Sequence, residues 1–300
     1  MRPLALLSFV SISLVSATLL TGFFDPAAGS SEDARREGGT APSDDVASPA
    51  RPTGAGTVSP GSYLGRLPTS VAPPAPVAAG AEAEACPAGM VLIAGGYCPK
   101  VKQECVKYME DPLKFPRARC AEFAPTSECL ADKIPLSFCI DKLEAAQENL
   151  LPVGDVSWTA AKAVCEGEGK RLCQEREWTL ACEGEAMQPY PNGFVRDATA
   201  CNFDHTEGLV TQKGQLADLR QPVDANARCE SPYGVRNMVG NIDEWVVLDK
   251  PHYSDKNGGR KMMSGLKGGW WGPMRNRCRP TTVDHDEIFH ELQTGFRCCL

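Results

Sequence analysis

Cysteine is the residue type with the widest range of chemistry in this sequence. The chain has 14 cysteines in 300 residues, and none of them precedes Cys86. Thiolates bind soft metal ions, act as nucleophiles or oxidise to disulfides. An even number of cysteines confined to one segment behind an apolar N-terminus is typical of a disulfide framework formed in an oxidising compartment. We therefore expect structural bridges and an extracytoplasmic protein, whether periplasmic, secreted or membrane-anchored.

Oxygen atoms that bind a hard metal ion are concentrated in the segment NMVGNIDEW. Asn237 and Glu244 offer side-chain oxygens, and Gly240 and Ile242 offer backbone carbonyls from a tight turn. Hard oxygen ligands from one closely wound segment suit Ca²⁺. The segment therefore predicts a structural calcium site, the alternative being a Gly-Asn turn in which Glu244 forms a salt bridge.

The C-terminal part of the chain contains a group of aromatic and cationic side chains. Trp270 and Trp271 are succeeded by Arg275 and Arg277. Indole and guanidinium groups stack on sugars and peptides, so these four residues are candidates for ligand binding. Packing in the core is the alternative for the tryptophan pair.

The first 85 residues are expected to place the rest of the chain outside the cytosol. Residues 3–24 form an uncharged apolar run after Arg2, which predicts, within residues 1–24, a signal peptide or a signal anchor attached to a membrane. Residues 25–85 are more than half Ala, Gly, Ser and Pro. Such a composition buries too little apolar surface to fold, and it predicts a disordered linker.

Residues 86–300 are enough for one hydrophobic core. Their first part predicts a strand from Met90 to Ile93 and a turn at Gly95, with Cys86 and Cys98 placed to close a hairpin. A Cys-, Pro- and charge-rich insertion at 99–135 predicts loops held by bridges. Helices are expected after Ser157 and at 175–182, and few long periodic elements follow. These features predict an irregular, disulfide-rich α+β domain. The formal net charge of −7 argues against a nucleic-acid-binding protein.

Several segments follow one another in the order of a known family. They are VSWTAAKAVCEGEGKRLCQEREWTLACEGE, SPYGVRNMVGNIDEW, LKGGWW, RNRC and TGFRC. In this order the chain resembles the sulfatase-modifying-factor family, which includes formylglycine-generating enzymes. The resemblance implies a C-type-lectin-like fold and two bridges, Cys165–Cys298 and Cys182–Cys278. It also implies calcium at the positions of Asn237, Gly240, Ile242 and Glu244, and Asn202 and Phe203 match part of a second calcium site.

One departure from the family affects its chemistry. The family's oxidase binds Cu(I) through two cysteines in the loop that follows a GGS motif, and it oxidises a sulfatase cysteine there. The matching loop here reads GGWWGPMRNRC, is shorter, and contains no cysteine before Cys278. Cys278 itself matches a structural cysteine of the family. Copper is therefore not expected as a cofactor.

Two functions are compatible with the sequence. The first is an exported binding or accessory module without oxidase activity, whose partner is a peptide, a protein or a glycan. The second is a formylglycine-generating oxidase with a non-standard thiol pair drawn from Cys173, Cys201, Cys229 and Cys299. We favour the first function, because the loop lacks the oxidase pair.

Overall fold

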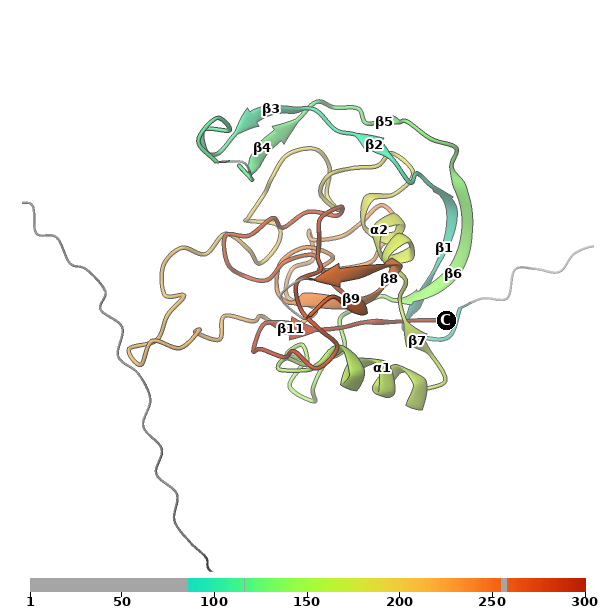
Figure 1. The fold of residues 1–300 in the computed structure, drawn as a ribbon, viewed down its shortest axis with the longest axis vertical. Coiled ribbons are helices and arrows are strands. Elements are labelled where there is room, and N and C mark those ends of the chain that lie inside the picture. Colours follow the sequence, from blue (N-terminus) through green and yellow to red (C-terminus); the bar gives the residue numbers. More distant parts are fainter. Residues whose placement is uncertain (1–85, 116, 255–257) are drawn as a thin grey trace, which may run out of the picture. The chain divides into compact units, whose positions relative to one another are not determined.

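The computed structural model describes residues 86–115, 117–254 and 258–300 (Figure 1). The expected signal or anchor segment and the expected linker lie outside these residues. Within the described ranges, no helix is both long and apolar enough to cross a membrane.

The first of two four-stranded sheets joins the two ends of the domain. Its order is β1 (Met90–Tyr97), β6 (Ile134–Asp141), β12 (Cys298–Cys299) and β7 (Arg171–Leu172). β1 and β6 are antiparallel over their whole length, with Met90 opposite Asp141. β12 lies between β6 and β7, so the C-terminal end of the chain lies beside the β1–β6 hairpin (Figure 1).

The second four-stranded sheet includes the last three residues of the segment NMVGNIDEW. Its order is β10 (Thr281–Thr282), β9 (Arg260–Lys267), β8 (Asp243–Ser254) and β11 (Thr294–Gly295). β8 and β9 are antiparallel, with Glu244 opposite Lys267, whereas β11 runs parallel to β8. The turn therefore ends where β8 begins, next to the TGFRC segment.

Two helices pack against these sheets. In α1 (Trp158–Gly167), the Ser157 side chain accepts a hydrogen bond from the backbone N–H of Ala160, which is the expected N-cap. α2 (Glu175–Glu183) begins with a capping box and ends at Gly184, whose φ of 65° favours glycine. α2 contacts β1 and β8, so its buried residues belong to the core that both sheets share.

The insertion at 99–135 continues the β1–β6 hairpin. It is held by bridges as expected, Cys98–Cys129 and Cys105–Cys120, but it forms short paired strands where we expected loops. β2 (Val101–Lys102) pairs with β5 (Glu128–Cys129), and β3 (Cys105–Tyr108) pairs with β4 (Cys120–Phe123). The result is a narrow antiparallel ribbon that arches over the rest of the domain (Figure 1). Cys120 and Phe123 bury their side chains against Tyr190, and this small cluster fixes the ribbon to the domain.

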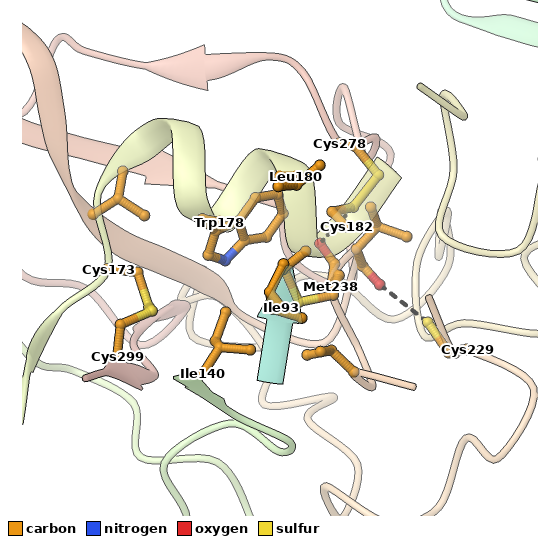
Figure 2. Close-up of a cluster of buried hydrophobic side chains, with 14 of the residues drawn as sticks. Ile93, Ile140, Cys173, Trp178, Leu180, Cys182, Cys229, Met238, Cys278 and Cys299 are labelled. Atoms are coloured by element: carbon orange, nitrogen blue, oxygen red, sulfur yellow. Dashed lines mark hydrogen bonds between the residues drawn. A yellow bond between two sulfur atoms is a disulfide. The ribbon is translucent and has the colours of Figure 1, made fainter. Parts of the chain in front are cut away.

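All 14 cysteines are within the described residues, and none of them is free. The seven bridges are Cys86–Cys139, Cys98–Cys129, Cys105–Cys120, Cys165–Cys298, Cys173–Cys299, Cys182–Cys278 and Cys201–Cys229. Cys173–Cys299 and Cys182–Cys278 lie in one buried cluster with Trp178 (Figure 2). This disulfide density indicates folding in an oxidising environment.

The bridges agree with the expectations in two pairs and correct a third. Cys165–Cys298 and Cys182–Cys278 are formed, and they connect α1 and α2 to the C-terminal segment. The expected bridge between Cys86 and Cys98 is wrong. Gly95 and Gly96 are part of β1, not of a turn, and this strand of 8 residues separates the two cysteines. An extended strand of that length spans about 26 Å, whereas the Cα atoms of a disulfide lie within about 7 Å.

Candidate functional site

The segment NMVGNIDEW forms the tight turn that its glycine and asparagines predict. Asn237, Gly240 and Asn241 have φ values of 55°, 77° and 61°. A side chain at position 240 would clash with the backbone carbonyl of Asn202, so only glycine fits there. The turn places Asn237 and Glu244 in the interior, each with about 1% of its surface exposed.

Glu244 is neutralised by an arginine. Arg297 Nε and Nη2 donate hydrogen bonds to the two Glu244 carboxylate oxygens, both at 2.6 Å. Trp178 Nε1 donates to Glu244 Oε2 at 2.7 Å. Burial acts to lower the pKa of Arg297, but the adjacent Glu244 carboxylate outweighs it and the pKa is raised. The salt-bridge alternative for Glu244 is the arrangement in the structure.

The fit of calcium to this turn depends on which oxygens are available. Asn237 Oδ1 is buried without a hydrogen-bond partner among the described residues, while Asn237 Nδ2 donates to Glu144 and to the Val223 carbonyl. Ca²⁺ takes about six to eight oxygen ligands. Arg297 and Trp178 donate three hydrogen bonds to the Glu244 carboxylate, and the Ile242 N–H donates to the Gly240 carbonyl. This arrangement therefore leaves few free oxygens besides Asn237 Oδ1, and the four residues alone do not complete the coordination of Ca²⁺. Calcium stays a prediction from the resemblance.

The residues of the second calcium prediction have other contacts. Asn202 Oδ1 lies 2.8 Å from His205 Nε2, and the Asn202 carbonyl accepts a hydrogen bond from the N–H of Asn241. Phe203 is buried, and the guanidinium of Arg196 lies 4.7 Å from its ring centroid. The offered oxygens of Asn202 are thus used within the protein, and this site too stays a prediction.

Glu144 is a buried acid that the sequence did not single out. It accepts hydrogen bonds from Asn237 Nδ2 at 2.8 Å and from Asn241 Nδ2 at 3.0 Å. Burial, and secondly the charge of Glu244, raise the pKa of Glu144 to about 8. Glu144 therefore holds a proton at neutral pH in the folded state.

Of the two tryptophans of the GGWWGPMRNRC loop, Trp271 is buried and Trp270 is half-buried. Trp271 is fully buried, so the prediction that it contacts a ligand is wrong. Trp270 stands edge-on to Trp271, with ring centroids 5.4 Å apart, and its ring occupies the space beside Gly272. Neither ring lines the cavity described next.

That cavity lies between the GGWWGPMRNRC loop and the ribbon at 99–135, and its volume is about 600 Å³. Among the residues that the structure describes, no acidic residue lines it and six arginines do: Arg117, Arg119, Arg196, Arg275, Arg277 and Arg279. Arg275 and Arg277 are the two candidate ligand-binding residues that the structure brings to a cavity. Arg279 continues the alternation of Arg275 and Arg277 along the loop, whereas no sequence pattern marks Arg117, Arg119 and Arg196.

Three of these arginines have carboxylate partners. Arg119 pairs with Glu110 and Asp204, Arg196 also pairs with Asp204, and Arg279 pairs with Glu183. In the part of the chain that the structure describes, Arg117, Arg275 and Arg277 form no ion pair. Burial, together with the positive charges of Arg275 and Arg196, lowers the pKa of Arg277. The cavity thus has an excess of positive charge.

Both walls of the cavity are held firmly. On one wall, Asn276 and Cys278 are buried and alternate with Arg275, Arg277 and Arg279. Asn276 Nδ2 donates to the Trp270 carbonyl, and Cys278 is bridged to Cys182. On the other wall, the Cys105–Cys120 bridge lines the cavity, and Tyr190 Oη donates to the Cys120 carbonyl at 2.5 Å. We refer to this space as the arginine cavity.

Asp243 is another buried acid, like Glu144. It lines a small pocket of about 20 Å³, and Arg275 and Arg277 line both this pocket and the arginine cavity. Asp243 Oδ1 accepts a hydrogen bond from the Gly269 N–H at 2.9 Å. Burial raises the pKa of Asp243 to about 7, although the Gly269 hydrogen bond and Arg275 act against it. The pocket has room for about one water molecule.

Comparison with known proteins decides the family. Residues 125–300 match the family described as "Sulfatase-modifying factor enzyme 1-like domain". The chain belongs to this family. Its irregular, disulfide-rich α+β domain accordingly has the C-type-lectin-like fold expected for a sulfatase-modifying-factor domain.

Two curated relatives illustrate the family. The chain is 31% identical over 157 residues to "Inactive C-alpha-formylglycine-generating enzyme 2" of Bos taurus, which covers 49% of each chain. It is 35% identical over 99 residues to "Formylglycine-generating enzyme" of Bos taurus, covering 32% of this chain and 26% of the relative. The chain thus spans at most about half the length of these relatives. Among solved structures, "Crystal Structure of CarF" aligns with a TM-score of 0.46 and 16% identity, over 70% of this chain and 97% of that one.

The cysteines of this sulfatase-modifying-factor domain do not fit the family's copper site. Cu(I) in the oxidase is held by two thiolates, but the matching loop supplies Pro273 and Met274 instead. Cys278 is buried in its bridge to Cys182. The four cysteines of the oxidase alternative are bridged as well, as Cys173–Cys299 and Cys201–Cys229. No pair of thiols is left among them to bind the metal.

Proposed function

We propose that this chain is an exported, non-oxidase member of the sulfatase-modifying-factor family that binds a peptide, protein or glycan in the arginine cavity. The observation that carries the proposal is the contrast between the two sides of one loop. Its cysteine is closed in a buried bridge, whereas Arg275 and Arg277 face a cavity of about 600 Å³.

The bridges support the absence of oxidase activity. Formylglycine formation in this family uses a thiolate-held Cu(I) that is open to oxygen and to the substrate thiol. A disulfide sulfur is not a thiolate, and Cys278 and Cys182 are both fully buried. The Met274 thioether is partly exposed, but a single thioether does not exchange with a substrate thiol. The 31% identity to a relative named as inactive is consistent with this proposal.

The size and lining of the arginine cavity support a binding role. Ligand pockets in proteins have volumes of about 300–1,000 Å³ and a few polar groups that fix the ligand's orientation. Tyr108 and Phe115 also line the cavity, and both rings are about half exposed. Aromatic rings beside guanidinium groups offer stacking and hydrogen bonding to the same ligand.

The seven bridges support export, because such a framework persists in an oxidising compartment. In this proposal the segment 3–24 directs or anchors the protein, and the linker 25–85 holds the domain away from a membrane. This arrangement would present the arginine cavity to partners outside the cytosol.

The oxidase half of the proposal is tested with the full chain, Cu(I), oxygen and a peptide that contains the CxPxR motif. The mass of the peptide cysteine is followed, and the formylglycine-generating enzyme of Bos taurus serves as the positive control. We expect no conversion. Conversion to the aldehyde at a rate that follows the concentration of this chain would overturn the proposal.

The binding half is tested by filling the cavity. Ala118 lines the cavity, so Ala118→Trp is expected to occlude it. Peptides and glycans that bind the wild-type chain in a library screen are expected to lose binding to this variant. Retained binding by a variant with an unchanged melting temperature would place the ligand elsewhere and overturn this half.

A further inference from the structure

The charge of the arginine cavity is opposite to that of the chain. The chain has a formal net charge of −7, yet six arginines and no acidic residue line this space within the described part of the chain. A concave, partly dehydrated site lined by one sign of charge concentrates ligands of the opposite sign. This feature points to an anionic ligand.

The unpaired guanidinium groups lie on both walls. Arg275 and Arg277 belong to the loop at 268–280, and Arg117 belongs to the ribbon. Arg275 Nη2 donates one hydrogen bond to Thr282 Oγ1 at 2.9 Å, and the Arg277 guanidinium lies 5.6 Å from the Phe123 ring centroid. These contacts orient the two side chains without neutralising them, so their remaining N–H groups are available to a ligand.

The choice of arginine indicates what kind of anion fits. None of the described lysines lines the cavity. The planar fork of arginine donates two parallel hydrogen bonds to an oxyanion, and arginine is favoured over lysine where such bidentate recognition matters. A tetrahedral oxyanion has four terminal oxygens, or three when it is a monoester, and these accept hydrogen bonds from guanidinium groups on opposite walls. A planar carboxylate has only two oxygens and reaches fewer of these groups.

The aromatic residues indicate what kind of group the anion is attached to. Tyr108 is 47% exposed and Phe115 is 54% exposed, and Pro112 completes an apolar part of the lining. Phe115 and Arg117 also line an adjoining, more apolar hollow with Pro273 and Met274. A flat ring attached to the oxyanion has surfaces here on which to stack.

From these observations we propose that the arginine cavity binds a phosphate or sulfate group carried on a ring, through Arg275, Arg277 and Arg117. This inference rests on the proposed function and names the ligand class of its cavity. Phosphate and sulfate esters share the chemistry that the guanidinium groups recognise, and the test below separates them.

The test uses calorimetric titration of the full chain at low ionic strength. The probes are phenyl phosphate, phenyl sulfate, inorganic phosphate, inorganic sulfate and the neutral phenyl glucoside. We expect at least one ester to bind at least tenfold more tightly than its inorganic ion, and phenyl glucoside not to bind. The stronger of the two esters identifies the preferred oxyanion. Equal binding of phenyl glucoside, or no binding of either ester, would overturn the inference.

Variants test whether the esters bind in the arginine cavity. Arg277→Gln is expected to weaken ester binding at least tenfold, and Arg277→Lys to restore only part of it, because lysine lacks the fork. Arg228→Gln is the matched control, since Arg228 is an exposed arginine outside the cavity that pairs with Asp197. We expect it to change the affinity less than twofold. If Arg277→Gln keeps the wild-type melting temperature and the wild-type affinity, the inference is wrong.

The failure of this inference is distinguishable from that of the proposed function. If no ester binds while a neutral peptide or glycan binds and Ala118→Trp removes that binding, the ligand class is wrong and the binding module stands. If the esters bind as expected and the CxPxR peptide is also converted, the ligand class stands and the non-oxidase proposal is wrong.

Discussion

Arg297 and Glu244 form a two-point ion pair in the interior, with 0% and 1% of their side-chain surfaces exposed. The pair joins the C-terminal TGFRC segment to the first residues of β8 and thus ties the end of the chain to the NMVGNIDEW turn. Buried ion pairs of this kind stabilise little compared with apolar replacements, but losing one partner is costly, because the other charge stays buried.

Arg297→Met should therefore lower the free energy of unfolding by roughly 3–5 kcal/mol, measured by urea denaturation. The double variant Arg297→Met/Glu244→Gln should recover part of this loss, since its neutral amide still accepts the Trp178 hydrogen bond. The exposed pair Arg228–Asp197 is the control, and Arg228→Met should cost about 1 kcal/mol or less. A double variant as unstable as the sum of its single variants would contradict the role of the pair.

Glu144 should make the domain less stable as the pH rises. Its pKa is about 8 in the folded state against 4.5 ordinarily, so between these values the folded state keeps a proton that the unfolded state releases. Stability contributed by this group is complete below pH 4.5, falls up to about pH 8 and is constant above it. The loss of stability over this range should be on the order of 1 kcal/mol per pKa unit. Glu144→Gln should flatten this part of the profile, because an amide does not titrate.

The profile is measured as the melting temperature in steps from pH 4.5 to pH 9, for the wild type and for Glu144→Gln. Glu148→Gln, at a solvent-exposed position, is the matched control and should follow the wild type. Parallel profiles for wild type and Glu144→Gln would show that Glu144 does not titrate in this range.

Calcium is tested by chelation. Calcium at this turn stays a prediction from the resemblance, and the buried Asn237 Oδ1 is an oxygen that would bind it. We expect a chelator to lower the melting temperature of the wild-type domain, added Ca²⁺ to restore it, and Asn237→Ala to remove this sensitivity. An unchanged melting temperature would contradict the calcium site.

The Cys105–Cys120 bridge should matter for binding as well as for stability. It closes a sequence separation of 15 residues, which corresponds to about 3 kcal/mol by chain entropy, and it lines the arginine cavity. Replacing both cysteines by serine should weaken ester binding severalfold. The same replacement at Cys86 and Cys139, which do not line the cavity, should leave the affinity unchanged. Equal affinity in both double variants would show that the ribbon does not hold the cavity wall.

Local signals predicted the parts of the fold that depend on neighbours in sequence. Ser157 caps α1 because its own side chain reaches the helix N–H groups, and Gly240 marks the turn because no other residue fits there. The bridges of α1 and α2 to the C-terminal segment came from the resemblance. The Cys86–Cys98 prediction failed because local spacing does not reveal that Gly95 and Gly96 continue a strand paired with β6.

The site was predictable on only one wall for the same reason. Arg275 and Arg277 were singled out from the loop in which they lie. Arg117 and Arg119 lie in the part of the ribbon that precedes the family match at 125–300, and Arg196 lies in a loop. Their convergence depends on tertiary contacts, such as the Tyr190 hydrogen bond to Cys120, that leave no pattern in the sequence.

The central claim, that the cysteines serve structure and not oxidation, is tested most directly by counting thiols. The full chain, exported through an oxidising compartment, is denatured without reductant and treated with iodoacetamide, and its intact mass is measured. With all 14 cysteines bridged, no label should be incorporated. Two labels on one pair of neighbouring cysteines, in a protein whose native form binds Cu(I) through that pair, would contradict the claim and restore the oxidase.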